Sequence, residues 1–103
     1  MNNKIVAAFK FKVNPLYQEE FDRLYSHAKK YVNAIDGHEG HEVFTGEDDH
    51  HLLVVYFRDK ESFLAWDEHP EHKKYKERGK KEIFLSYDVS VGEIFERHTR
   101  HEE

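Results

Sequence analysis

Apolar and polar residues alternate at the start of the chain, and this two-residue period predicts a β-strand. Every second residue from Ile5 to Val13 is apolar. Asn14 and Pro15 then predict the start of a helix, because Asn caps free N–H groups and Pro is tolerated at the first helical position. Apolar residues recur every three or four positions as far as Ile35, and Gly37 is expected to end this helix as a left-handed cap.

Two more strands are predicted after the helix. A short one runs from about His41 to Thr45, and the polar segment Gly46 to His50 is typical of a hairpin loop. The next strand, Leu52 to Phe57, is apolar at every position. A strand of this kind has to be covered on both faces, so it is expected at the centre of the sheet.

The second helix is expected to be broken. Asp59 is a suitable N-cap, and Pro70 disturbs the helical turn before it. We therefore expect a break near residues 68–69, with His69 capping a second segment that ends at Gly79. The last strand is predicted from about Glu82 to Phe95, where apolar and polar residues alternate.

The order strand–helix–strand–strand–helix–strand predicts an α+β protein with a ferredoxin-like βαββαβ antiparallel sheet. Its first and third strands lie at the centre, and its two helices cover one face. The third strand needs cover on the other face too, and a second copy of the chain is the simplest source, which predicts a homodimer. Residues 1–97 are expected to form one domain, and residues 98–103 a disordered tail.

Composition narrows the functional classes. The net charge is −5 with His neutral, which argues against nucleic acid as a partner. There is no Cys for thiolate chemistry, and no apolar run reaches the length of a membrane-spanning helix. The start of the chain lacks a signal-peptide core, so the cytoplasm is the expected location. No glycine-rich phosphate loop is present, which makes a dinucleotide cofactor unexpected.

A family resemblance rests on the second helical region. The segment Phe63 to His72 contains a Trp-x-x-His-Pro-x-His spacing, follows a strand ending at Phe57, and precedes Gly79 and the strand at Ile83 to Tyr87. This pattern resembles the antibiotic biosynthesis monooxygenase domain over nearly the whole chain. The resemblance implies a dimeric α+β barrel with a pocket between sheet and helices. Some such relatives oxygenate polycyclic aromatic compounds with O₂ and no metal or flavin, and others degrade haem.

The chain departs from the haem-degrading relatives at two of three positions. Those relatives use a Trp, a His about ten residues later, and an Asn on the first strand. Here Trp66 matches, Lys76 stands at the second position, and the first strand has no Asn. Some cofactor-free oxygenases carry an amide one turn before the Trp, where this chain has Ser62.

The resemblance and the residue types together suggest a candidate site. Trp66 is expected to stack on a planar substrate, although packing in the core would also explain it. His72 is the candidate base, because its ordinary pKa lies near neutrality, and a helix-surface or capping His is the alternative. Several aromatic residues are expected to shape the pocket: Phe9, Phe11, Tyr56, Tyr75 and Tyr87. The sequence does not decide which alternating set of strand residues faces the helices.

Nine histidines raise the question of a metal, since His38/His41, His69/His72 and His98/His101 are each three positions apart. A metal site needs further ligands at suitable spacing, and none follow, so no metal is expected. The leading hypothesis is a cofactor-independent monooxygenase for a small aromatic or quinol-like substrate. The alternatives are a module that binds haem or another apolar ligand, and an interaction protein with a vestigial pocket.

Overall fold

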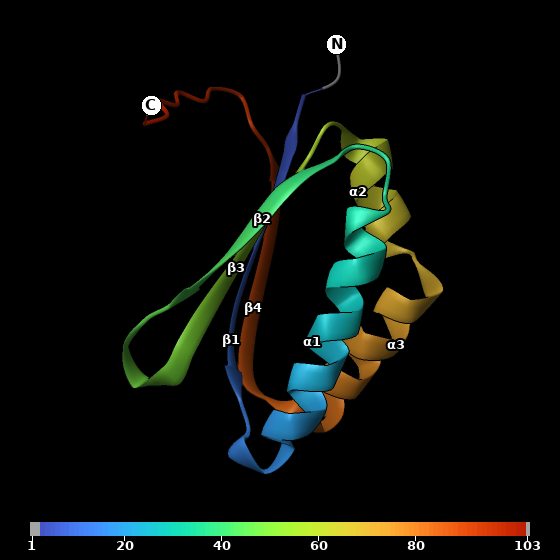
Figure 1. Cartoon of the computed structure of the whole chain (residues 1–103), viewed down its shortest axis with the longest axis vertical. Helices are drawn as coiled ribbons and strands as arrows, with labels where there is room; N and C mark the ends of the chain where they lie inside the picture. Colours follow the sequence, from blue (N-terminus) through green and yellow to red (C-terminus); the bar gives the residue numbers. More distant parts are fainter. Residues whose placement is uncertain (1–2, 103) are drawn as a thin grey trace.

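The computed structural model describes residues 3–102, which form one four-stranded antiparallel sheet with helices on one side (Figure 1). The strand order is β2-β3-β1-β4, so the first and third strands are central, as predicted. The elements are β1 (Ile5–Val13), a 3₁₀ turn (Pro15–Tyr17), α1 (Gln18–Asn33), β2 (His38–Thr45), a 3₁₀ turn (Glu47–Asp49), β3 (His50–Phe57), α2 (Lys60–Asp67), α3 (Pro70–Arg78), a π turn (Gly79–Ile83) and β4 (Phe84–Glu93).

The predicted caps form their hydrogen bonds, although Asn14 caps the 3₁₀ turn Pro15–Tyr17 and α1 itself begins only at Gln18. The side chain of Asn14 accepts from the N–H of Leu16, and Asp59 accepts from the N–H of Ser62. The helix break also lies where Pro70 places it, between α2 and α3, and the Nδ1 atom of His69 accepts from the N–H of Glu71. Side chains that satisfy free N–H groups are therefore readable in the sequence before any packing is known.

Some element ends differ from the prediction. The helix α1 ends at Asn33, two residues before the end predicted at Ile35. The strand β2 begins at His38 because Gly40, at a φ of 146°, absorbs an irregularity in its pairing with β3. The strand β4 starts later than predicted, because the π turn takes up the chain as far as Ile83, and it ends at Glu93, two residues before the predicted end.

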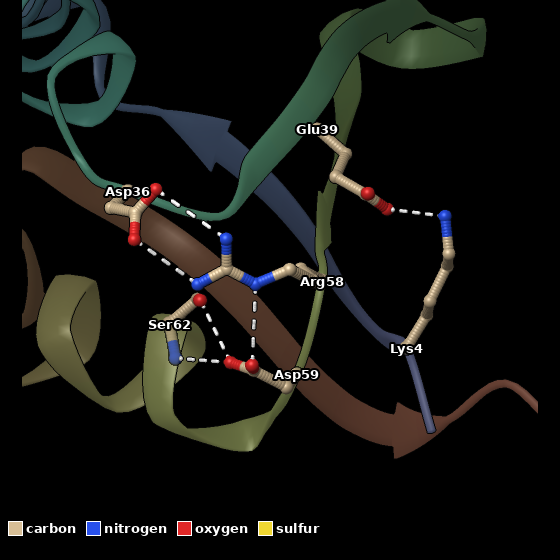
Figure 2. A network of polar contacts seen from close by, with 6 residues as sticks. All are labelled: Lys4, Asp36, Glu39, Arg58, Asp59 and Ser62. Carbon is tan, nitrogen blue, oxygen red and sulfur yellow. Dashed lines mark hydrogen bonds and ion pairs between the residues drawn. The ribbon is translucent and has the colours of Figure 1, made fainter. Parts of the chain in front are cut away.

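A polar network closes the junction of α1, β3 and α2 (Figure 2). The Arg58 guanidinium lies 3.2 Å from the Asp36 carboxylate and 3.3 Å from Asp59. Gly37 turns the chain here with a φ of 93°, and a side chain at this position would collide with Ser62. Glycine is thus needed both for the left-handed backbone and for the close approach of α2.

The two faces of the sheet have different surroundings. Odd-numbered residues of β1 and β3 face the helices, and the core there is made of Ile5, Ala7, Phe11, Val13, Val55 and Phe57 with Val32 and Ile83. The outer face has no layer over it in residues 3–102 and carries half-buried apolar residues such as Leu52 and Val54. No helix of this part of the chain is long and apolar enough to cross a membrane.

Candidate functional site

A cavity of about 180 Å³ lies between the helix-facing side of the sheet and the helices α1 and α3. Phe9 and Phe11 of β1 line it from the sheet, and Trp66, His72 and Tyr75 line it from α2 and α3. The walls are mainly apolar, which is typical of a site for a small organic molecule.

Trp66 and His72 both line this cavity, and their ring centroids lie 4.1 Å apart. Trp66 lies near the end of α2, and His72 lies in the first turn of α3. The break before Pro70 redirects the chain between them. Both rings therefore belong to the lining of the same cavity.

The environment of His72 disfavours its charged form. Burial is the main cause that lowers the pKa of His72 to about 4; nearby Lys76 and His69 act in the same direction, and Asp67 opposes them. The imidazole is therefore neutral at pH 7. Its Nδ1 atom lies 3.1 Å from the hydroxyl oxygen of Tyr31 on α1.

Tyr31 is a functional candidate that the sequence did not reveal. It lies on α1, and 41 residues separate it from His72. Its ring stacks on His69, with centroids 4.7 Å apart and planes at 7°. Burial first, and then the acidic groups of Tyr75 and Glu71, raise the pKa of the Tyr31 hydroxyl, so it stays protonated. No spacing pattern could have paired it with His72, because the contact joins two helices.

The predicted pocket aromatics divide between the two faces of the sheet. Phe9, Phe11, Tyr75 and Tyr87 line the cavity. The prediction for Tyr56 was wrong, because Tyr56 lies opposite Val6 on the outer face. Consecutive strand residues point to opposite faces, so with Val55 and Phe57 facing the helices, Tyr56 must face away.

Basic residues outnumber acidic ones around the cavity. Lys29, Lys76 and Lys80 line it, and Asp67 is the one carboxylate among the lining residues. The Lys76 ammonium pairs with Asp67 at 2.9 Å. The Lys29 ammonium lies 4.9 Å from the centroid of the Tyr25 ring, another lining residue. A chain with a net charge of −5 thus surrounds this cavity with a local excess of positive charge.

The histidine pairs do not assemble a metal site in the described part of the chain. His38 and His41 lie close, with Nε2 of the first 3.1 Å from Nδ1 of the second, and burial followed by the nearby His41 lowers the pKa of His38. Within residues 3–102, no three His, Asp or Glu side chains are placed to hold a metal ion.

Comparisons with known proteins agree with this architecture. A family model described as antibiotic biosynthesis monooxygenase matches residues 4–78. Among solved structures, Rv0793 from Mycobacterium tuberculosis is 13% identical, with a TM-score of 0.79 over 93% of this chain and 99% of that one. Protein SO0527 from Shewanella oneidensis is 16% identical, with a TM-score of 0.76 over 89% and 91%.

A further similar structure is SnoaB from Streptomyces nogalater, described as a cofactor-independent oxygenase. It is 10% identical, with a TM-score of 0.75 over 92% of this chain and 96% of that one. At these identities the likeness concerns the fold. No curated protein matches the sequence.

Proposed function

The chain belongs to the antibiotic biosynthesis monooxygenase family, and from this premise we propose that it is a cytoplasmic, cofactor-independent monooxygenase for a small aromatic or quinol-like substrate. The observation that carries the proposal is the pairing of Trp66 and His72 in one mainly apolar cavity. The indole offers a flat surface for an aromatic ring, and the imidazole offers a polar group beside it.

The proposed reaction needs O₂ and no other reactant. An activated CH₂ group of the substrate loses a proton, and the resulting carbanion transfers electrons to O₂ and forms a C–O bond. Loss of water then leaves a carbonyl, so that R₂CH₂ and O₂ give R₂C=O and H₂O. One oxygen atom ends in the product and the other in water, which is the balance of a monooxygenase.

The low pKa of His72 limits its strength as the base. Removing a proton from a phenol of ordinary pKa near 10 would be uphill by roughly 8 kcal/mol for a base with a pKa of about 4. A turnover of about one per second corresponds to a total barrier of roughly 17 kcal/mol, so this proton transfer alone would take up about half of the barrier. A substrate that binds already ionised avoids the cost.

Oxygen consumption tests the proposal directly. An oxygen electrode would follow the protein with a panel of anthrones and quinols, and we expect uptake with at least one of them. The variants Trp66→Ala and His72→Phe should lower the rate at least tenfold. Tyr56→Phe, on the opposite face of the sheet, is the matched control and should leave it unchanged. Absence of uptake across the panel, or full activity in His72→Phe, would reject the proposed function.

The alternative function was a haem-binding module. Lys76 stands where the haem-degrading relatives have a His, and its ammonium pairs with Asp67, so this position offers no imidazole ligand to iron. A hemin titration distinguishes the two functions. We expect no shift of the Soret band, whereas a shift that disappears in His72→Ala would replace the oxygenase by a haem-binding protein.

We also propose that two copies pack through the outer face of the sheet. Leu52 and Val54 are half-buried there and Phe44 is 51% exposed. Burying a fully exposed side chain of this kind contributes roughly 1.5–3 kcal/mol, so covering what remains exposed here contributes a fraction of that for each residue. Both signs of charge occur on this face, with Lys10 opposite Asp88, so two copies related by a two-fold axis need not bring like charges together. A monomeric mass in sedimentation at micromolar concentration would reject the dimer.

A further inference from the structure

The hydrogen bond between Tyr31 and His72 has a preferred direction. A phenol O–H is a better donor than an imidazole N–H, and an imidazole nitrogen is a better acceptor than a phenol oxygen. The Tyr31 hydroxyl has no other hydrogen-bond partner in residues 3–102. It therefore donates to Nδ1 of His72, which leaves the ring proton of the neutral imidazole on Nε2.

The position of Tyr31 is supported from the other side of its ring. Tyr31 stacks on His69, and His69 is held in turn by the bond that its Nδ1 atom accepts from the N–H of Glu71 at the start of α3. Two helices thus maintain the geometry before any ligand arrives. This is the kind of support that keeps a polar group of a binding site in one orientation.

The Nε2–H group of His72 is a donor without an acceptor. It has no hydrogen-bond partner among the described residues. Every fully buried side-chain nitrogen or oxygen atom in residues 3–102 has a hydrogen-bond partner, so an unpartnered Nε2 is not fully buried. His72 lines the cavity, whose other walls are mainly apolar. A ligand that carries an acceptor oxygen at this point would satisfy it.

The charges around the cavity favour a negative acceptor. Lys76 is neutralised by Asp67, but Lys29 and Lys80 form no ion pair with a carboxylate of residues 3–102. A negatively charged oxygen would therefore meet the N–H donor of His72 inside the cavity, and the exposed lysines Lys29 and Lys80 add a positive potential around it that water partly screens.

We propose that the cavity binds a planar aromatic molecule as its oxyanion, a phenolate or an enolate, with the Nε2–H of His72 donating to the charged oxygen. Tyr31 is a positioning residue that keeps the proton on Nε2. This deepens the proposed function, on which it rests for the use of this cavity by a substrate, and it makes His72 an anion-binding donor in place of a base.

Ligand binding can be followed through the protein itself, because Trp66 is the only tryptophan of the chain. The probe is 4-nitrophenol at slightly acidic pH, where the free molecule is mostly the colourless phenol. The titratable groups near His72, whose charges could also change with pH, are Tyr31, His69, Asp67 and Lys76. We expect quenching of the Trp66 fluorescence together with the yellow absorbance of the phenolate, and an affinity for phenolate at least tenfold above that for phenol. Binding of the neutral phenol with equal affinity would overturn the proposal.

Variants of His72 connect this preference to one atom. His72→Phe should abolish the preference for phenolate, whereas His72→Gln, which keeps an N–H donor, should retain part of it. Tyr56→Phe is the control on the opposite face and should bind the probe as the wild type does. Circular dichroism checks that each variant is folded. An unchanged preference in a folded His72→Phe would overturn the proposal.

The position of the ring proton can be read without any substitution. A two-dimensional ¹⁵N–¹H spectrum of the wild-type protein should show His72 protonated on Nε2, and Tyr31→Phe should shift the signal towards a mixture of the two tautomers. A proton on Nδ1 in the wild type would overturn the assignment. The binding and NMR experiments need no turnover, so they are independent of the oxygen measurement. A preference for phenolate without O₂ uptake would reject only the monooxygenase proposal. O₂ uptake without this preference would reject only the inference about oxyanion binding.

Discussion

The two faces of the sheet are built from the same strands but reach different states of burial. On the helix side, Val55 and Phe57 are 2% and 0% exposed. On the outer side, Val54 remains half-buried and Phe44 is 51% exposed, although the residues are just as apolar. Along the central strands the helices close one face and enclose a cavity there, whereas Val43, Val89 and Val91 on the edge strands of that same face stay 41%, 57% and 47% exposed. No helix covers the other face in residues 3–102. An apolar pattern therefore states that a face has to be covered, but not what covers it.

The largest effect is expected from removing a ring of the closed face. Phe57→Ala should lower the free energy of unfolding by about 3–5 kcal/mol, because Phe57 is fully buried against Phe63 and Trp66 and its loss leaves a cavity. Denaturant unfolding measures the change. Phe44→Ala removes the same atoms from the outer face and should cost at most about half as much. Equal costs would mean that the two faces do not differ in burial.

A second effect concerns the acid stability of the cavity on the closed face. Folding holds the pKa of His72 at about 4, below its ordinary value of about 6.5 in the unfolded chain. The unfolded state therefore binds more protons between these values, and stability falls as the pH drops from about 6.5 to about 4, by roughly 3 kcal/mol. Unfolding curves across this range measure the loss.

The variant His72→Phe isolates this contribution of His72. His38, whose pKa is also lowered, and the carboxylates of Glu20, Asp59 and Glu82 act in the same direction as the pH falls. They are present in both proteins, so the difference between the wild type and His72→Phe belongs to His72. Parallel pH profiles for the two proteins would show that the imidazole titrates normally.

The outer face can be tested by placing a charge on it. Val54→Asp puts a carboxylate in the middle of the apolar outer surface, beside Ala8 and Glu42 on the neighbouring strands. We expect the dissociation constant of the dimer to rise roughly 100-fold, which corresponds to about 3 kcal/mol or slightly less. Sedimentation at several concentrations measures it. Ala65→Asp, on the exposed side of α2, should leave association unchanged, and equal effects of both changes would refute the assignment of the interface.

The smallest effect is expected from a single side-chain contact on the outer face. The guanidinium of Arg97 lies 4.3 Å from the centroid of the Tyr56 ring. Arg97→Ala should cost about 0.5–1 kcal/mol, the usual range for an exposed cation–π contact. Thermal unfolding compares it with Arg100→Ala, which loses no such contact. A cost of several kcal/mol would mean that Arg97 is buried by the partner copy.

Local signals in the sequence predicted the elements well. The strand from Ile5 to Val13 has its predicted limits, and the caps at Asn14, Asp59 and His69 form the expected bonds. Each of these features depends only on residues that are close together in the sequence. The end of α1 was less accurate, because the turn at Gly37 is set by its packing against Ser62 on α2.

The candidate site was predicted in part for the same reason. Trp66 and His72 lie six residues apart around a proline, so their approach follows from a local break. Tyr31 could not be assigned, because its contact with His72 depends on how α1 packs on α3. Tyr56 was assigned wrongly, since alternation alone leaves the two faces of β3 equivalent.

By itself, the sequence determined the order of the strands and helices, their caps, the break before Pro70 and the demand for cover on both faces of β3. These properties depend on the period of side chains along the backbone and on hydrogen bonds between near neighbours. Only the tertiary structure decided which face encloses the cavity, that Tyr31 meets His72, and that the imidazole is held neutral. Burial, charge and hydrogen bonds at a site arise between segments far apart in the chain, and no periodicity along the chain encodes them.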